Sequence, residues 1–446
     1  MDTIKQNFSE IMKAAQQDGA KVEMLISGGE NLSLGFQKKK LDSFESTQSQ
    51  MAGFRVVVGP NQGYAYTENL SLESLLRTYK EALLNAKTVQ SEHTAEIPLV
   101  KPNSQTSEMN LFRPENISIE EKMKVARLLE EKCFEDSRIQ SVPYSGFDET
   151  ISYRRILNSE GLDREFKQSY YSGYTYPLAK EGESSKMDGE GFFVRSFSEI
   201  NVEEIARKGI AKVVSRLGAQ KLKTGNYAVV IDKDQFPMVL TMISGYLSAK
   251  SVHEKISLLQ GKKDQKIASE KFVLHDDPFE LRGASVRPFD AEGAPSQKTV
   301  LFENGVLKSF LTNLEYAQKM NLPHTSHAAR GPSSTMDIAP TNLIVQKGTK
   351  SLPELLASHK QVVHLTKFAG GLHAGFKEST GDFSMPAEGF LYENGQKVGP
   401  VDQFVMSGNV LDLLMKIEEL GNEYNKPGSS YICPDVLVSQ LSFAGA

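Results

Sequence analysis

Two β-hairpins are encoded in the C-terminal half of the chain. Residues 387–396 read AEGFLYENGQ, in which an apolar run ends at Asn394-Gly395. Residues 302–306 read FENGV and place a second Glu-Asn-Gly group around Asn304-Gly305. Asn-Gly supplies the positive φ angles that a type I′ turn requires between antiparallel strands. We therefore predict antiparallel strands on both sides of each pair, and interpret the recurrence as hairpin chemistry, not as a sequence repeat.

The segments around these hairpins predict a β-rich C-terminal domain, which we assign to residues 221–446. It begins with the apolar strand Asn226–Ile231, and an apolar helix from about Gln235 to Leu247 follows. It ends with the strand Val436–Leu441. Cys433, just before that strand, is expected to be a small buried core residue.

Helical and strand-like patterns alternate in the N-terminal part, which predicts an α/β layer domain over residues 1–95. Apolar residues recur at helical spacing from Ile4 to Ala15, with Gly19 as a stop signal, and a second helix fits Leu72–Ala86. Five short strand-like runs lie between the two helices: Val22–Ser27, Leu32–Gln37, Leu41–Ser49, Gly53–Val58 and Gly63–Thr67.

A polar, proline-bearing segment at residues 96–114 is the predicted linker to a middle α/β domain at residues 115–220. This domain is predicted to contain a capping box at Ser118 and Glu121 before the helix Lys122–Phe134, strands at Thr150–Leu157 and Phe166–Tyr176, and a helix at Val202–Leu217 between Asn201 and Gly218. The fold class is therefore α+β, with an N-terminal α/β layer region followed by a larger β-rich C-terminal domain.

Composition excludes several classes of protein. The 446 residues carry a formal net charge of −5, and the densest basic cluster is Lys38-Lys39-Lys40, so we expect no nucleic-acid partner. No apolar run approaches the length of a membrane helix, and the N-terminus has no apolar signal region, so we expect no membrane contact. Cys133 and Cys433 are too few for a disulfide framework, which favours a reduced, cytoplasmic protein.

The histidines form no recognisable catalytic set in the sequence. His253-Glu254 would need a second histidine one helical turn later to bind zinc, but Ser257 and Leu258 stand there. His324 and His327 lie in a proline- and glycine-flanked stretch and are interpreted as ordinary loop histidines. No Gly-x-Ser-x-Gly nucleophile motif is present. A metal site assembled from distant histidine and aspartate residues stays open.

A glycine-rich block follows the strand that contains His364. Gly370 and Gly371 are flanked by His364 and His373, and repeated glycines after a strand let a backbone approach a ligand closely or form a tight turn. No Gly-Lys-Ser/Thr follows, so the block is not a phosphate loop.

Several C-terminal motifs, taken together, resemble the TldD/PmbA family, and most closely its PmbA (TldE) branch. They are STGDFS at 379–384, AEGFLYENG at 387–395, SGNVLD at 407–412, LGN at 420–422, Cys433, and SFAG at 442–445. The resemblance extends over most of the chain through DAEG at 290–293 and the hairpin at 303–305, and more loosely through Phe36–Ser49 and Gly53–Val58.

The resemblance implies one subunit of a cytosolic heterodimeric metalloprotease that degrades or processes unfolded peptides. TldD-type subunits carry a His-Glu-x-x-x-His helix, and the matching helix here, Gln235–Leu247, contains neither histidine nor glutamate. We therefore expect no catalytic residue and no metal in this chain, zinc in a TldD-type partner, and a heterodimer with that partner or a homodimer alone. The expected peptide-binding residues are Gly370, Gly371, His373, Thr380, Gly381, Asp382 and Ser384.

Two alternatives remain beside this interpretation. One is a stand-alone hydrolase with an unrecognised site. The other is a non-enzymatic regulatory or scaffold protein, to which the family's label as a modulator of DNA gyrase belongs.

Overall fold

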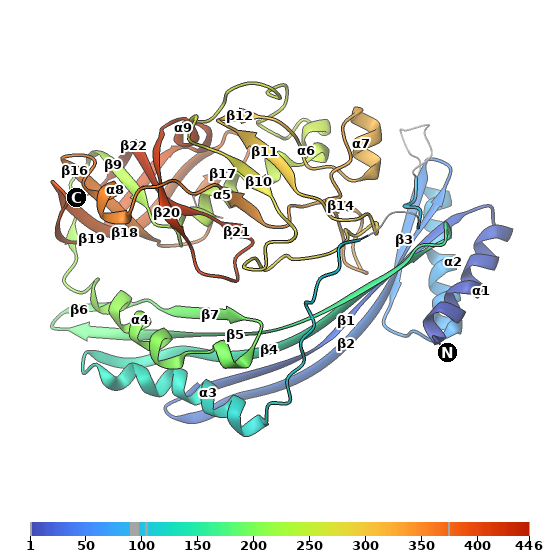
Figure 1. The fold of residues 1–446 in the computed structure, drawn as a ribbon, viewed down its shortest axis with the longest axis horizontal. Coiled ribbons are helices and arrows are strands. Elements are labelled where there is room, and N and C mark those ends of the chain that lie inside the picture. Colours follow the sequence, from blue (N-terminus) through green and yellow to red (C-terminus); the bar gives the residue numbers. More distant parts are fainter. Residues whose placement is uncertain (1, 90–97, 103–105, 373–374, 446) are drawn as a thin grey trace.

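The chain forms a long curved sheet and a β-rich C-terminal domain that lies on the concave side of that sheet (Figure 1). The structure is a computed structural model that describes residues 2–89, 98–102, 106–372 and 375–445. No helix within those residues is long and apolar enough to cross a membrane. The predicted α+β fold class is confirmed.

The curved sheet is antiparallel, and its strands run in the order β3-β2-β1-β4-β5-β6, with β7 also paired to β5. These strands are β1 (Lys21–Gln37), β2 (Lys40–Val58), β3 (Asn61–Thr67), β4 (Ile139–Asn158), β5 (Asp163–Glu181), β6 (Ser184–Met187) and β7 (Glu190–Val194). The prediction of four short strands before Gly63 is wrong, because β1 and β2 are single long strands. Gly28 and Gly29 keep extended backbone and pair with Gln50 and Ser49, so the strand continues through them.

Four helices cover the two ends of this sheet (Figure 1). They are α1 (Thr3–Gln17) and α2 (Leu72–Thr88) at one end, and α3 (Ile119–Glu131) and α4 (Val202–Val214) at the other. Short 3-10 helices occupy Lys132–Glu135 and Phe197–Glu199. The predicted capping box of Ser118 and Glu121 is confirmed, and the Asn201 side chain accepts a hydrogen bond from the backbone N–H of Glu204. Local cap chemistry therefore sets both helix starts.

Five strands of the C-terminal domain pair in a closed ring, which makes a barrel. The ring consists of β9 (Gly225–Ile231), β16 (Gln361–Phe368), β18 (Asp382–Glu393), β19 (Gln396–Asn409) and β22 (Pro434–Ala444). Three short strands extend it: β8 (Gln220–Lys221), β17 (Phe376–Lys377) and β20 (Ile417–Tyr424). The largest hydrophobic core of the described residues lies here, with Phe404 and Phe443 fully buried.

Smaller elements complete the domain. A five-stranded sheet contains β10 (Leu274–Asp276), β11 (Thr299–Glu303), β12 (Val306–Leu307), β15 (Leu343–Val345) and β21 (Tyr431–Ile432), and β13 (Ala328–Ala329) pairs with β14 (Asp337–Ile338). The helices are α5 (Phe236–Ser244), α6 (Ala249–His253), α7 (Leu314–Met320), α8 (Leu352–Leu356) and α9 (Val410–Met415), with a 3-10 turn at Gly245–Leu247.

Both predicted Asn-Gly turns are confirmed. Asn304 and Gly305 have φ angles of 48° and 78° and join β11 to β12. Asn394 and Gly395 have φ angles of 50° and 77° and join β18 to β19. These are the left-handed conformations that a type I′ turn requires at both central positions.

A buried network of charges joins the sheet to the C-terminal domain. Arg55 of β2 contacts Glu23 of β1 at 3.0 Å and Glu292 of the C-terminal domain at 3.2 Å. Arg330 of the C-terminal domain contacts the other oxygen of Glu23 at 2.8 Å. All four side chains are fully buried, and two cations balance two anions. The two parts of the molecule therefore meet through paired charges that water does not reach.

Candidate functional site: an aspartate–histidine cluster beside an interdomain cleft

Helix α5 occupies the position where the sequence resemblance implied a catalytic metal in related subunits. Pro237 lies in its first turn, and its buried side chains are Phe236, Val239, Leu240, Met242 and Ile243. Thr241, one of its polar residues, donates its hydroxyl to the carbonyl of Pro237 at 2.9 Å. Zinc in proteins is held by imidazole, thiolate or carboxylate groups, and α5 supplies none. The helix therefore does not fit a metal ion, and its role here is to fill the core.

The predicted peptide-binding residues lie near one end of the barrel. Gly370 and Gly371 are exposed, and Gly370 has a φ of 121° with open space where a Cβ would stand. Gly381 is buried, with a φ of 78°. The exposed residues among the rest are Thr380, Asp382 and Ser384. His373 lies outside the described residues.

Hydrogen bonds fix the shape of the turn at residues 378–381, between β17 and β18. The Thr380 hydroxyl donates to Asp382 at 2.6 Å, and the Asn409 side-chain amide donates to the Asp382 carboxylate and the Thr380 carbonyl. The backbone N–H of Ser384 donates to the carbonyl of Gly375. The arrangement presents an ordered, exposed turn beside β17, and its role in peptide binding stays a prediction.

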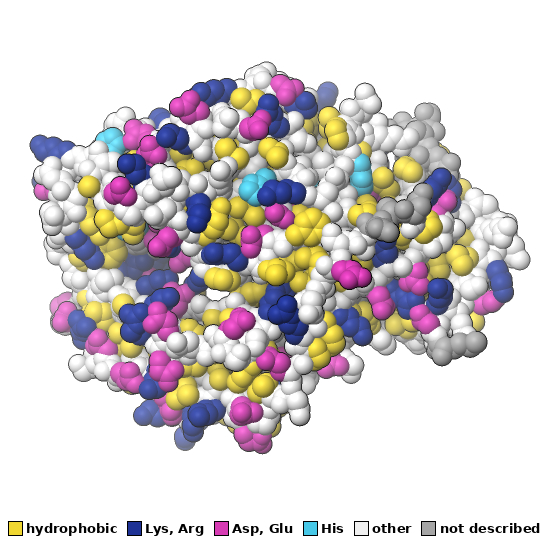
Figure 2. All heavy atoms as spheres, in the orientation of Figure 1, with side chains coloured by type: hydrophobic (Ala, Val, Ile, Leu, Met, Phe, Trp, Pro, Cys, Tyr) yellow, Lys and Arg dark blue, Asp and Glu magenta, His cyan; other side chains and the backbone are white. Residues whose placement is uncertain are grey.

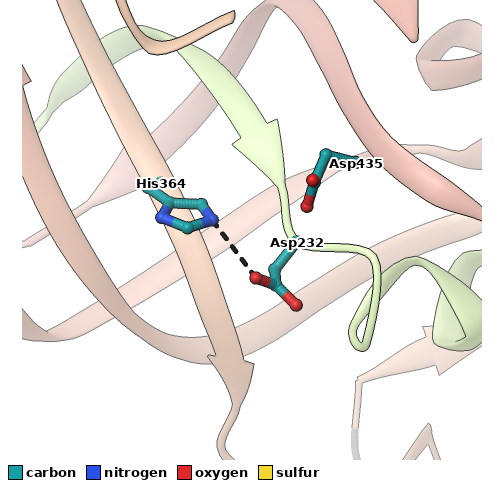
Figure 3. Close-up of side chains that lie close together, drawn as sticks. All are labelled: Asp232, His364 and Asp435. Atoms are coloured by element: carbon teal, nitrogen blue, oxygen red, sulfur yellow. Dashed lines mark ion pairs between the residues drawn. The ribbon is translucent and has the colours of Figure 1, made fainter. Parts of the chain in front are cut away.

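Three side chains that the sequence did not connect come together at the end of the barrel strands (Figure 3). Asp232 directly follows β9, His364 lies in β16, and Asp435 lies in β22. Strand pairing sets His364 opposite Val230 and Val436 opposite Ile231, which places the three residues side by side. Their ligand atoms all lie within 4.8 Å of one another.

The two carboxylates of this cluster are anchored by backbone groups. The N–H of Asp234 donates to Asp232 Oδ1 at 2.8 Å, and the N–H of Lys233 donates to Asp435 Oδ1 at 2.8 Å. His364 Nε2 approaches Asp232 Oδ2 at 3.3 Å. Burial and the negative charge of Asp232 raise the pKa of Asp435 to about 6, because the buried site disfavours a second carboxylate charge.

The cluster borders a cleft of about 680 Å³ between the sheet and the C-terminal domain. Its walls come from β7, α4, residues 232–234, Arg282 and residues 424–427. In Figure 2 this face is hollowed between the two parts of the molecule, with basic and acidic side chains gathered around the opening. Asp232 is the member of the cluster that lines the cleft, so the cluster is reachable from solvent through it.

Ion pairs connect the two sides of the cleft. Glu190 of β7 contacts Lys212 of α4 at 2.6 Å and Lys426 of the C-terminal domain at 2.5 Å. Lys212 also lies 3.5 Å from Asp234. Burial opposes the ionisation of Glu190, but the two lysines outweigh it, and the net result is a lowered pKa for this carboxyl group. The cleft is therefore held by charges on both of its sides.

A second carboxylate–histidine group, Asp290, Glu292 and His324, lies at the interface between the sheet and the C-terminal domain. Asp290 accepts backbone hydrogen bonds from Glu292, Ala294 and Ala328, and Glu292 accepts from Arg55 and from the backbone of Leu314. Burial raises the pKa of Glu292, and the charge of Arg55 opposes that rise. These carboxylates already have cationic and backbone partners, so we assign the group a structural role.

The remaining candidate histidines, His327, His324 and His253, lie outside the Asp232 cluster. His327 is buried between Asp276 and Thr325, at 2.9 Å from each, and together with His324 it lies outside helices and strands, as predicted. His253 is exposed at the end of α6. Cys433 is fully buried, which confirms its expected core position, and burial raises the pKa of its thiol.

The sequence contained only a faint signal for the Asp232 cluster. An aspartate directly after the apolar strand Asn226–Ile231 is the kind of residue that often reaches a site at a sheet end. In the sequence, His364 stands out only for its place before the glycine block. Asp232 and Asp435 lie far apart in the chain, so only strand pairing reveals that they share a site with His364.

Comparison with known proteins places the whole chain in one family. The family models for PmbA/TldA metallopeptidases match as domain 1 at residues 22–86, central domain at 112–217 and C-terminal domain at 224–445. The metalloprotease PmbA of Escherichia coli O157:H7 is 24% identical over 97% of this chain and 94% of its own length. A PmbA homolog of Haemophilus influenzae is 25% identical over 99% of this chain and 96% of its own length.

Solved structures share the fold over the whole chain. A proposed modulator of a DNA gyrase from Thermotoga maritima superimposes with a TM-score of 0.91 at 27% identity and covers 99% of this chain and 100% of its own. TldE from Thermococcus kodakarensis has a TM-score of 0.85 at 21% identity and covers 98% and 100%. The chain therefore belongs to the family of PmbA/TldA metallopeptidases, the TldD/PmbA family that its motifs resemble.

Proposed function

We propose that this chain is the non-catalytic subunit of a two-chain metallopeptidase that cleaves unfolded peptides in the cytoplasm. The observation that carries the proposal is helix α5, whose buried side chains are apolar. The sequence resemblance matches this helix to the metal-binding His-Glu-x-x-x-His helix of TldD-type subunits. Membership of a metallopeptidase family supports peptide hydrolysis as the reaction. The lack of metal ligands on α5 supports a non-catalytic role for this chain. Zinc would then be supplied by a second, TldD-type chain.

In this arrangement the chain would help to hold the substrate. β17 is the last strand of its sheet in the pairing order and pairs with β18 among the described residues. An extended peptide can add to such an edge through its backbone, which gives affinity with little sequence preference. The turn at residues 378–381 lies between β17 and β18. Gly370, Gly371, this turn and the first residues of β18, Asp382 and Ser384, are the contacts that we assign to the peptide.

The test is reconstitution with the TldD-type chain of the same genome. Each chain alone, each with added Zn²⁺, and the mixture are assayed with an unfolded fluorogenic peptide. We expect hydrolysis only by the mixture, and co-elution of the two chains in gel filtration. Hydrolysis by this chain alone would overturn the proposal and favour the stand-alone hydrolase.

The peptide contact is tested with Gly371→Trp in the reconstituted enzyme. A bulky side chain on the exposed backbone should raise KM for the peptide several-fold and leave zinc content unchanged. Gly399→Ala is the matched control, because its added Cβ meets nothing within 4 Å. Equal kinetics for the two variants would remove this region from the substrate site.

A regulatory role is favoured by one observation, the description of the Thermotoga maritima structure as a proposed modulator of a DNA gyrase. The net charge of −5 argues against direct contact with DNA, so such a role would act through protein contacts. Failure of the TldD-type chain to bind, together with a change in gyrase supercoiling activity on adding this chain, would favour regulation over peptidase function.

A further inference from the structure

The Asp232, His364 and Asp435 cluster has the features of a preformed cation site, independently of the proposed function. Both Asp232 Oδ1 and Asp435 Oδ1 are fixed by backbone N–H groups of the segment Lys233–Asp234. This arrangement orients the carboxylates without using up their other oxygens. Fixed ligands with outer hydrogen bonds are the usual construction of metal sites in proteins.

His364 Nε2 forms an ion pair with Asp232 in the cluster but no aligned hydrogen bond. Its ring is more than nine-tenths buried, and Nε2 has no hydrogen-bond partner among the described residues. The 3.3 Å contact with Asp232 Oδ2 is an ion-pair distance without the alignment of a hydrogen bond. As an acceptor, Nε2 would face a carboxylate oxygen, and as a donor it is misaligned. A cation placed between the nitrogen and the two carboxylates resolves both problems.

Nearby lysines do not neutralise the cluster by direct contact. Lys233 pairs its ammonium with Glu423 at 2.6 Å, and Lys212 pairs with Glu190 and Asp234. By contrast, the carboxylate of Glu292 in the second cluster is held by Arg55. Within the part of the chain that the structure describes, Asp232 and Asp435 therefore have no lysine or arginine in direct contact, unlike Glu292.

We propose that Asp232, His364 and Asp435 bind one divalent transition-metal ion of the zinc type beside the cleft. One imidazole nitrogen with two carboxylate oxygens suits Zn²⁺ or Mn²⁺ better than Ca²⁺ or Mg²⁺, which prefer oxygen alone. Two ligands of a tetrahedral zinc ion lie about 3.4 Å apart when bonds are about 2.1 Å long. The distance of 3.3 Å between His364 Nε2 and Asp232 Oδ2 already matches this spacing. The ligand atom of Asp435 lies within 4.8 Å of the other two, so a side-chain adjustment brings it to the same spacing.

Such an ion would link three strands of the barrel beside the cleft. Asp232 lines the cleft, so a fourth ligand position would face solvent or a bound group there. The site is separate from α5, which ends at Ser244 and supplies no ligand. Zinc binding without peptide hydrolysis by the isolated chain would thus leave the proposed function intact, and absence of binding would remove only this inference.

The experiment is zinc titration of the full chain after chelator treatment and gel filtration, by calorimetry and native mass spectrometry. We expect one ion per chain with micromolar or tighter affinity. His364→Gln and Asp435→Asn should each weaken binding at least about 100-fold, since loss of a direct ligand exceeds the effect of losing an outer hydrogen bond. X-ray absorption at the zinc edge should show nitrogen and oxygen neighbours without the sulfur of Cys433.

Two matched variants identify the site. His359→Ala removes a half-exposed histidine that contacts Glu418 at 2.7 Å, and His324→Ala removes the histidine of the second cluster. Both should bind zinc as the parent chain does. Retention of binding by His364→Gln, loss of binding in His324→Ala, or no saturable binding of Zn²⁺ or Mn²⁺ by the parent chain would each overturn the proposal. Should His364→Gln fail to fold, Asp435→Asn and the absorption spectrum of the parent chain decide.

Discussion

At the scale of single residues, local chemistry in the sequence determined what could be foreseen. The Asn-Gly turns, the capping box at Ser118 and Glu121, and the burial of Cys433 each depend on a few neighbouring residues, and each was predicted correctly. The partners of Asp232 were not foreseen, because they come from strands more than a hundred positions away. Residue identity alone gives no sign of which distant strands will pair.

The turn at Gly305 provides a residue-scale prediction. Its φ is 78°, and an added Cβ would stand 2.2 Å from the carbonyl oxygen of Ala268. Gly305→Ala should therefore lower the free energy of unfolding by about 2–3 kcal/mol, from backbone strain together with a backbone clash. Urea unfolding followed by circular dichroism measures the change. Gly399→Ala, at an uncrowded position in β19, should change stability by less than about 1 kcal/mol. Equal effects would show that the turn tolerates a side chain.

At the scale of elements, the sequence patterns predict whether a segment is a helix or a strand better than they predict where it begins and ends. The helices at Leu72–Thr88 and Val202–Val214 and the strand Gly225–Ile231 were found close to their observed bounds. β1 and β2 were each divided in two, because glycines and polar residues in a long strand resemble a break. Both faces of β2 are largely exposed from Lys40 to Gln50, so no apolar alternation marks the strand there.

The ion pairs of Glu190 at the cleft predict how low pH affects the stability of the folded chain. Glu190 links β7 to α4 and to the C-terminal domain, and its pKa in the folded chain lies below the ordinary value of 4.5. A lowered carboxyl pKa contributes stability above the unfolded pKa, and that stability is lost as pH falls through the folded pKa. Glu190→Gln should therefore be less stable than the parent chain at pH 7 by about 1–3 kcal/mol.

The difference between Glu190→Gln and the parent chain should shrink as pH falls below about 4.5. Denaturant unfolding at a series of pH values measures it. Glu204→Gln, which removes an exposed carboxylate paired within α4, is the control and should show no comparable difference at pH 7. A stability difference for Glu190→Gln that is constant with pH would show that the ion pairs do not hold the cleft.

At the scale of the whole molecule, local motifs are enough to predict the fold class and the family, whereas the architecture depends on long-range contacts. No sequence motif within residues 21–58 or 290–330 predicts that these two segments contact each other. The contact depends on Glu23, Arg55, Glu292 and Arg330, which come from both parts of the chain and are fully buried. Buried charges need their partners, so this network couples the folding of the sheet to that of the C-terminal domain.

The coupling is tested with Arg55→Met. The variant leaves Glu23 with Arg330 alone and Glu292 without its cationic partner, in a place that water does not reach. Removal of one member of a buried ion pair costs about 3–5 kcal/mol, and here the loss falls on the contact between the two parts. We expect the variant to unfold at a lower temperature and in two calorimetric transitions, where the parent chain shows one.

Arg77→Met is the matched control, because Arg77 is an exposed helix residue 3.9 Å from Glu81, where such pairs contribute about 0.5 kcal/mol or less. If Arg55→Met unfolds like Arg77→Met, the network is not what joins the two parts, and the ion pairs around the cleft would have to carry the coupling.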